Sequence, residues 1–185
     1  MKRLIFVIFF LITSIIGFSQ EKKAYQLFNK KGKRVDYGKL LIAAEKAQVV
    51  LFGEYHNNAI SHWIELELTK DLADKNKIIL GAEMIEADNQ KQLDQYLNGE
   101  INQKKLDSTA RLWPNYKTDY KPLVDFAKAK KLPFIATNIP RRFASMVSKK
   151  GFEALEILTD EEKSWIAPLP MPYDENLPGY VNMMK

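Results

Sequence analysis

The sequence predicts an α/β fold: a mostly parallel sheet flanked by helices, incomplete at the C-terminus. Short apolar runs alternate with longer amphipathic segments, which is the pattern of βα units on a parallel sheet. The chain has 185 residues, of which 46% are hydrophobic, and this suffices for one domain with its own core. Three strands are expected, whereas sheets usually have about five or six. We therefore expect the fold to be truncated at its C-terminal end.

The first twenty residues have the layout of a secretory signal peptide. Lys2 and Arg3 precede the apolar run 4–18, which is shorter than the roughly 20 residues of a membrane-spanning helix. An uncleaved membrane anchor is the alternative. Cleavage after Gln20 would leave a domain of 21–185 and remove two of the 28 basic residues but none of the 23 acidic ones. The remaining excess of three positive charges does not indicate a protein that binds nucleic acid.

The chain has no cysteine. Disulfides, thiolate metal sites and a cysteine nucleophile are therefore excluded. Lipid attachment to a cysteine is excluded as well, so we do not expect a lipoprotein. The signal peptide predicts secretion through the inner membrane.

The elements follow in order after a polar, lysine-rich segment. Residues 47–52 are apolar and β-branched and are expected to form a buried strand that ends at Gly53. Asn57 or Asn58 can cap the next helix, which helical apolar spacing carries to residue 75. The remaining expected elements are a strand at 77–82, helices at 90–97, 104–111 and 120–131, a strand at 132–137 and a helix at 141–150.

The C-terminal segment differs in composition from the rest. Four prolines occur between Pro168 and Pro178, and such a stretch forms neither a helix nor a central strand. We expect an extended loop that positions side chains. Tyr173 and Tyr180 lie on this loop, and a packing role for either tyrosine is the alternative to ligand binding.

Polar residues follow each expected strand. Ligands of open parallel sheets bind beyond the carboxyl ends of the strands, where this chain has Glu54 and His56, then Glu83, then Arg141. We expect these side chains to converge on one edge, with His62 one turn inside the first helix. The carboxylates could instead be helix caps or ion-pair partners of Arg141.

The only two histidines fall within seven residues of each other, which favours a functional role. A divalent metal ion held by Glu54, His56, His62 and Glu83 is one alternative. The sequence lacks a glycine-rich phosphate loop, a Gly-x-Ser-x-Gly elbow and a His-Glu-x-x-His zinc motif. Nucleotide-binding, α/β-hydrolase and zincin functions therefore have no sequence support.

Four motifs occur together in a characteristic order. They are Val-Leu-Phe-Gly-Glu-Tyr-His-Asn-Asn at 50–58, Gly-Ala-Glu-Met at 81–84, Trp-Pro-Asn-Tyr at 113–116 and Phe-Ile-Ala-Thr-Asn-Ile-Pro-Arg-Arg at 134–142. With the proline-tyrosine loop, they make the chain similar to the ChaN-like haem-binding uptake family. This family is a branch of the superfamily that also contains the Tiki proteases and the erythromycin-esterase-like proteins.

The resemblance implies haem binding through a histidine and a tyrosine, with two haems stacked in a homodimer. The histidine corresponds to His56, and the tyrosine to Tyr180 or, as the alternative, to Tyr173. Tyrosinate is a hard donor that suits ferric haem. The side chains implied to line the pocket are Glu54, His62, Glu83 and Arg141. One departure is Asn57, where the family pattern has an aspartate after the histidine.

The predicted function is haem binding in haem or iron uptake. The implied partners are haem, a second copy of the chain and an outer-membrane haem receptor. The resemblance also implies a location in the periplasm or at the outer membrane. The alternative is a metal-dependent or Glu/His-dependent hydrolase of the wider superfamily, in which Glu54 or Glu83 activates water and His56 acts as acid or base. A structural α/β domain with ion-paired carboxylates is the third hypothesis.

Overall fold

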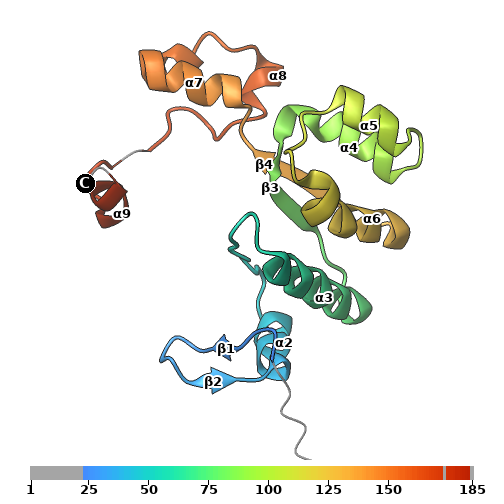
Figure 1. The fold of residues 1–185 in the computed structure, drawn as a ribbon. Coiled ribbons are helices and arrows are strands. Elements are labelled where there is room, and N and C mark those ends of the chain that lie inside the picture. The colour runs from blue at the N-terminus through green and yellow to red at the C-terminus, as the bar shows by residue number, and fades with distance from the viewer. Residues whose placement is uncertain (1–22, 173, 184–185) are drawn as a thin grey trace, which may run out of the picture. The chain divides into compact units, whose positions relative to one another are not determined.

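The structure, a computed structural model, describes residues 23–172 and 174–183 (Figure 1). The predicted signal peptide and Tyr173 lie outside the described residues. The chain divides into two compact units, 1–46 and 47–185. The predicted domain boundaries, 21–185, stay a prediction. Within the part of the chain that the structure describes, no helix has both the length and the apolar character needed to cross a membrane.

The first unit contains a short hairpin and one helix. Strands β1 (Leu27–Phe28) and β2 (Arg34–Val35) pair antiparallel. The turn between them includes Gly32, whose φ of 70° is accessible to glycine at little cost. Helix α2 (Tyr37–Glu45) begins after Asp36, whose side chain accepts a hydrogen bond from the backbone N–H of Lys39.

The second unit contains the remaining elements in alternating order. They are α3 (Ala59–Lys75), β3 (Leu80–Glu86), η1 (Ala87–Asn89), α4 (Gln90–Leu97), α5 (Gln103–Thr109), η2 (Tyr116–Tyr120), α6 (Lys121–Lys130), β4 (Phe134–Asn138), α7 (Arg141–Lys150), η3 (Phe152–Leu155), α8 (Asp160–Lys163) and α9 (Pro178–Met183). The predicted α/β class is confirmed, and the helices predicted at 90–97 and 141–150 have the bounds of α4 and α7.

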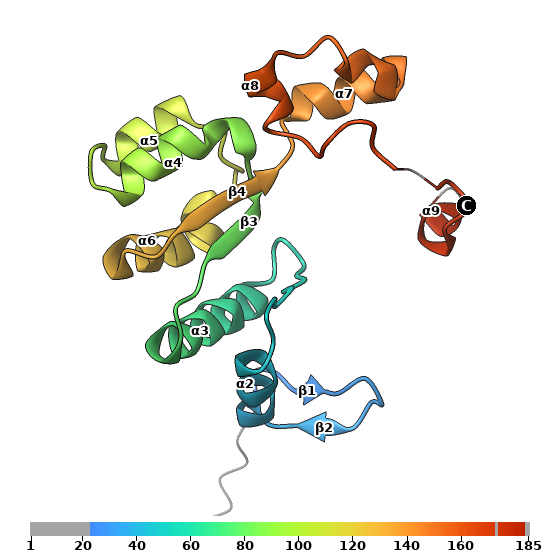
Figure 2. The same cartoon turned by 180° about the vertical axis from the view of Figure 1, so that it is seen from behind.

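Strands β3 and β4 form a parallel pair, with α4 and α6 beside it (Figure 2). One face of the sheet is buried: Phe134 and Ala136 of β4 join the core, whereas the alternate residue Ile135 is 47% exposed. The helices contribute to the same core through their apolar faces. Its members from α4 and α6 are Leu93, Tyr96, Leu123, Val124 and Ala127.

The free edge of β4 is closed by a side chain of α4. Gln90 donates through Nε2 to the Phe134 carbonyl at 2.9 Å and accepts through Oε1 from the Ala136 N–H at 2.6 Å. The amide thus replaces a neighbouring strand, because it offers a donor and an acceptor at the spacing of the backbone.

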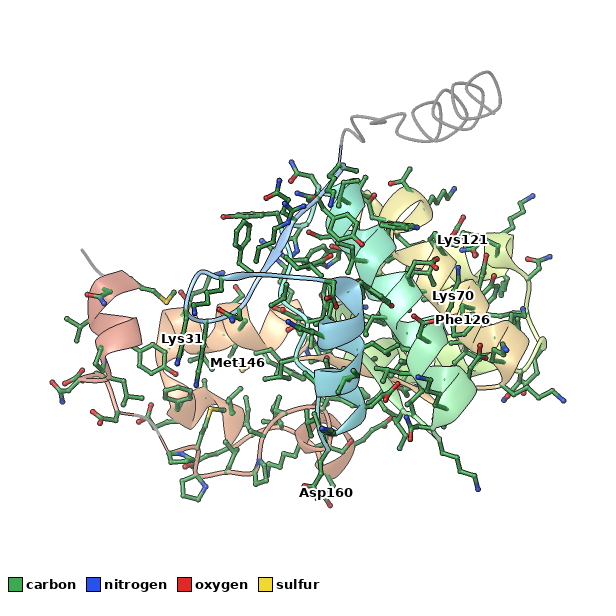
Figure 3. All side chains as sticks on the ribbon, turned by 90° about the horizontal axis from the view of Figure 1, so that it is seen from below. Lys31, Lys70, Lys121, Phe126, Met146 and Asp160 are labelled. Atoms are coloured by element: carbon green, nitrogen blue, oxygen red, sulfur yellow. The ribbon has the colours of Figure 1, made fainter. Side chains whose placement is uncertain are left out.

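Helices α3 and α6 also contact each other. On their surfaces, Lys70 of α3 pairs with Glu67, and Lys121 of α6 pairs with Asp125; both lysines are labelled in Figure 3. Such pairs within one helix contribute only a few tenths of a kcal/mol each. The elements that hold the candidate site are therefore fixed by their buried faces rather than by these ion pairs.

Two strand predictions need correction. Residues 47–52 form no strand in the described part of the chain, and Leu51 there is 92% exposed. The strand predicted at 77–82 is observed as β3 over 80–86, because pairing with β4 begins at Leu80, opposite Phe134. Glu83 therefore lies inside a strand and not after its end.

The segment after α8 agrees in part with the predicted loop. Residues 167–172 form neither helix nor strand. The loop prediction is wrong at its end, because Pro178, the last of the four prolines, begins the short helix α9, which also contains Tyr180; a proline fits the first turn of a helix. Before this segment, α7 and η3 bury a small apolar cluster of Phe143, Leu155 and Leu158.

Candidate functional site

Five polar side chains from three segments meet at the start of α3. They form what we call the Glu54 group: Glu54 and His56 from the loop before α3, His62 and Glu65 from α3, and Tyr120 from η2. All but His56 are at least half-buried, and His62 is 7% exposed. A buried set of ionisable side chains is a common feature of functional sites.

Local interactions place the loop and the helix start. The side chain of Asn58 accepts hydrogen bonds from the N–H groups of Ile60 and Ser61, at 3.0 and 3.1 Å, and so caps α3. Asn115 donates to the backbone carbonyl of His56 at 2.7 Å and ties the loop to the segment before η2. Two asparagines thus fix the loop that carries Glu54 and His56.

The two oxygens of Glu54 have different partners. Oε1 accepts a hydrogen bond from the Tyr120 hydroxyl at 2.8 Å and lies 3.3 Å from Nδ1 of His56. Oε2 lies 2.7 Å from Nδ1 of His62. The carboxylate therefore contacts both histidines of the chain.

The ring of His62 has a defined orientation. Its Nε2 lies 3.1 Å from the backbone carbonyl of His56, and because a carbonyl can only accept, this nitrogen carries the hydrogen. Its Nδ1 faces Glu54 Oε2, yet neither atom has a hydrogen bond of acceptable alignment within the described residues. Glu65 Oε2 is 3.9 Å from the same Nδ1.

Burial changes the proton affinity of two members of the Glu54 group. Desolvation raises the pKa of Glu65 to about 7; the charge of Glu54 adds to this rise, and His62 opposes it. Burial and the hydrogen bond to Glu54 raise the pKa of Tyr120 above its usual value. Tyr120 is therefore a neutral phenol that donates to a carboxylate.

His56 is the accessible member of the Glu54 group. Its side chain is 58% exposed, whereas the side chain of His62 is 5% exposed. The ring of Trp113 meets His56 edge-on, with 4.8 Å between ring centroids, and Tyr55 is 80% exposed beside it in the chain. An exposed imidazole next to aromatic side chains can take a flat apolar ligand.

The structure brings together three of the predicted site residues, Glu54, His56 and His62. The other predicted site residues that the structure describes lie elsewhere. Within residues 23–172 and 174–183, they make none of the contacts given above for the Glu54 group. Glu83 is exposed in β3, Arg141 is the exposed first residue of α7, and Tyr180 is 44% exposed on α9. Their predicted ligand-binding roles stay predictions.

Sequence reasoning missed Glu65 and Tyr120 as site residues. Glu65 follows His62 by three positions, a spacing that places two side chains on one helix face and could have been noticed. Tyr120 is 66 positions from Glu54. No local signal links the two, since only the fold brings η2 to the loop.

The fold and the site place this chain among α/β proteins that have a cluster of ionisable side chains, here a carboxylate, two imidazoles and a phenol, at the start of one helix. Residues 40–185 match the model of a family described as haem-binding uptake, Tiki superfamily, ChaN. The chain belongs to this family, as its motifs predicted.

The chain is also similar in fold to a solved structure of cofacial haem binding to ChaN of Campylobacter jejuni. The match has a TM-score of 0.57 and 19% sequence identity, and covers 68% of this chain. It spans 52% of the Campylobacter protein, about half its length. No curated protein matches the sequence.

Proposed function

We propose that this chain binds haem through His56 and takes part in haem or iron uptake. Membership of the ChaN family supports the choice of ligand. The observation that carries the proposal is the state of His56: its ring is accessible, while its Nδ1 lies beside a buried carboxylate oxygen at 3.3 Å.

The contact with Glu54 prepares His56 to bind a metal. Imidazoles that bind a metal through one nitrogen usually donate the hydrogen of the other to a carboxylate or carbonyl, which fixes the ring and makes it more basic. Here Nδ1 faces Glu54 Oε1, and Nε2 is the nitrogen left for iron. Haem, when bound, would supply an iron that this nitrogen of His56 could ligate.

The surroundings of His56 also suit haem. Trp113 packs edge-on against the imidazole, and Tyr55 adds exposed aromatic surface. We further propose Tyr180, or Tyr173 in its place, as the tyrosine ligand. Arg141 is a donor suited to a propionate, because a guanidinium binds carboxylates with two parallel hydrogen bonds.

The remaining parts of the proposal concern location and partners. Secretion by way of residues 1–20 would place the protein in the periplasm or at the outer membrane. There it would form a homodimer when haem binds and exchange haem with an outer-membrane receptor.

A hemin titration followed by absorbance tests the proposal. We expect a saturable Soret shift with the purified chain, and binding at least about tenfold weaker for His56→Ala, the loss typical of a disturbed metal centre. Asn57→Ala, at the exposed neighbouring position, is the matched control and should bind hemin like the unmodified chain. Equal affinities for His56→Ala and Asn57→Ala, with both proteins folded, would refute the assignment of His56.

Two further measurements address the tyrosine and the dimer. Tyr180→Phe and Tyr173→Phe should differ in the charge-transfer absorption of ferric tyrosinate haem, and the variant that loses this absorption identifies the ligand. Size-exclusion chromatography with and without hemin should show a haem-dependent dimer. A chain that stays monomeric at saturating hemin would contradict that part of the proposal.

A further inference from the structure

We propose that Glu54, His62 and Glu65 form a binding site for a first-row divalent cation such as Zn²⁺, distinct from haem binding at His56. The three side chains each offer one ligand atom, and these atoms all lie within 4.8 Å of one another. An imidazole nitrogen with two carboxylate oxygens is a donor set that Zn²⁺ accepts, at about 2.0–2.2 Å from each atom.

The strongest observation is the unsatisfied pair of atoms inside the Glu54 group. His62 Nδ1 and Glu54 Oε2 are both buried, 2.7 Å apart, and lack an aligned hydrogen bond. Nε2 of His62 donates to the His56 carbonyl, so Nδ1 is the ring nitrogen that faces the carboxylate. Buried polar atoms are rarely left without a partner. A cation in contact with both atoms would give each of them one.

The three donor residues converge on His62 Nδ1. Glu65 Oε2 reaches to 3.9 Å of this nitrogen from one helical turn further along α3. The two carboxylates give the site a charge opposite to that of the cation. A divalent ion is favoured over a monovalent one, because it balances both carboxylates.

The ligands are also held from behind. Tyr120 donates to Glu54 Oε1 at 2.8 Å, which leaves Oε2 directed at His62. The backbone carbonyl of His56 fixes the ring of His62 at 3.1 Å. Partners of this kind orient metal ligands and raise their affinity, typically by 10- to 100-fold.

Equilibrium dialysis of the untagged, EDTA-treated chain against Zn²⁺ tests the site. We expect one Zn²⁺ per chain and affinity at least about tenfold weaker for Glu65→Gln. The matched control is Glu67→Gln, on the same helix, where the carboxylate is 37% exposed and pairs with Lys70 instead. Mg²⁺ should compete poorly, because it prefers oxygen ligands and retains its water.

The test separates this site from haem binding. Among the described contacts, Glu65 reaches His62 and not His56. Glu65→Gln should therefore keep hemin affinity while losing Zn²⁺, and His56→Ala should keep Zn²⁺ while losing hemin. The Zn²⁺ proposal and the haem proposal can therefore fail independently of each other.

Co²⁺ bound to the unmutated chain gives a second readout that needs no variant. Visible d–d bands that Zn²⁺ displaces would support ligation by these residues. The proposal is overturned if the folded chain binds no Zn²⁺ saturably, if Glu65→Gln binds it as tightly as Glu67→Gln, or if His56→Ala abolishes it.

Discussion

Removing one oxygen atom from Tyr120 should measurably destabilise the protein. Tyr120 is 2% exposed, and its hydroxyl donates to Glu54 Oε1 at 2.8 Å. Hydrogen bonds to charged groups contribute about 1.5–3 kcal/mol, and Tyr120→Phe removes this bond while keeping the ring and its packing. We expect the free energy of unfolding to fall by about 2 kcal/mol. With a urea dependence of about 2 kcal/mol per molar, the unfolding midpoint moves down by about 1 M.

Tyr116 provides the matched control for this measurement. It lies in the same π-helical turn and is also 2% exposed, but its buried hydroxyl lies beside the neutral side chain of Gln103 rather than against a carboxylate. Tyr116→Phe should therefore lower the free energy of unfolding by less than Tyr120→Phe, by about 1 kcal/mol or less, because a neutral hydrogen bond contributes less than one to a charged group. Equal midpoints for Tyr120→Phe and Tyr116→Phe would show that the charge of Glu54 adds nothing to this contact.

Three other perturbations have defined outcomes. With EDTA present, the pKa of Glu65 is about 7 when folded against 4.5 unfolded, so its stability contribution is complete below pH 4.5 and is lost as the pH rises through 7. This loss amounts to at most about 3 kcal/mol, and parallel pH–stability curves for Glu65→Gln and the unmodified chain would contradict it. Gln90→Ala leaves the Phe134 carbonyl and the Ala136 N–H without their partner, which should cost about 2–4 kcal/mol in urea unfolding; a change below about 0.5 kcal/mol would count against this role. Asn58→Ala removes the cap of α3 and should cost about 1 kcal/mol, measured by thermal unfolding, whereas an unchanged midpoint would show that the cap is dispensable.

The helices were predictable because their signals are local. Asn58 accepts from the first N–H groups of α3, as a capping asparagine should, and the apolar spacing carried the prediction to the observed end at Lys75. The bounds of α4 and α7 also matched; α7 begins directly after Pro140 and ends at Lys150, before Gly151. Signals of this type need no information about distant parts of the chain.

The strands were predicted less well, because pairing is not local. β3 continues to Glu86, although the apolar run ends at Ala82. Ala82 and Ile85 are buried and Glu83 is exposed, and the pairing with β4 is irregular between Ala82 and Glu86, so this continuation neither stays apolar nor alternates regularly. The apolar run 47–52 has the composition of a strand, but composition does not tell whether a pairing partner is present.

The candidate site shows the same division between local and distant information. Glu54, His56 and His62 were predictable because all three lie within nine positions, in a loop and the first turn of the helix that follows it. Tyr120 was not, since its contact with Glu54 depends on how η2 packs against the loop. The prediction that all strand-end residues converge was wrong for Glu83, because β3 extends past this residue to Glu86.

The roles of the two histidines follow from the way Glu54 divides its oxygens. Oε1 serves Tyr120 and the exposed ring of His56, while Oε2 faces the buried ring of His62. One imidazole thus keeps an accessible nitrogen for a large ligand, and the other has only enclosed neighbours, which suits a small ion. Because the backbone carbonyl of His56 also accepts from the His62 ring, the loop that carries His56 and the start of α3 that carries His62 are linked directly. Two ligands of such different size can therefore be bound by residues only six positions apart, with one carboxylate orienting both rings.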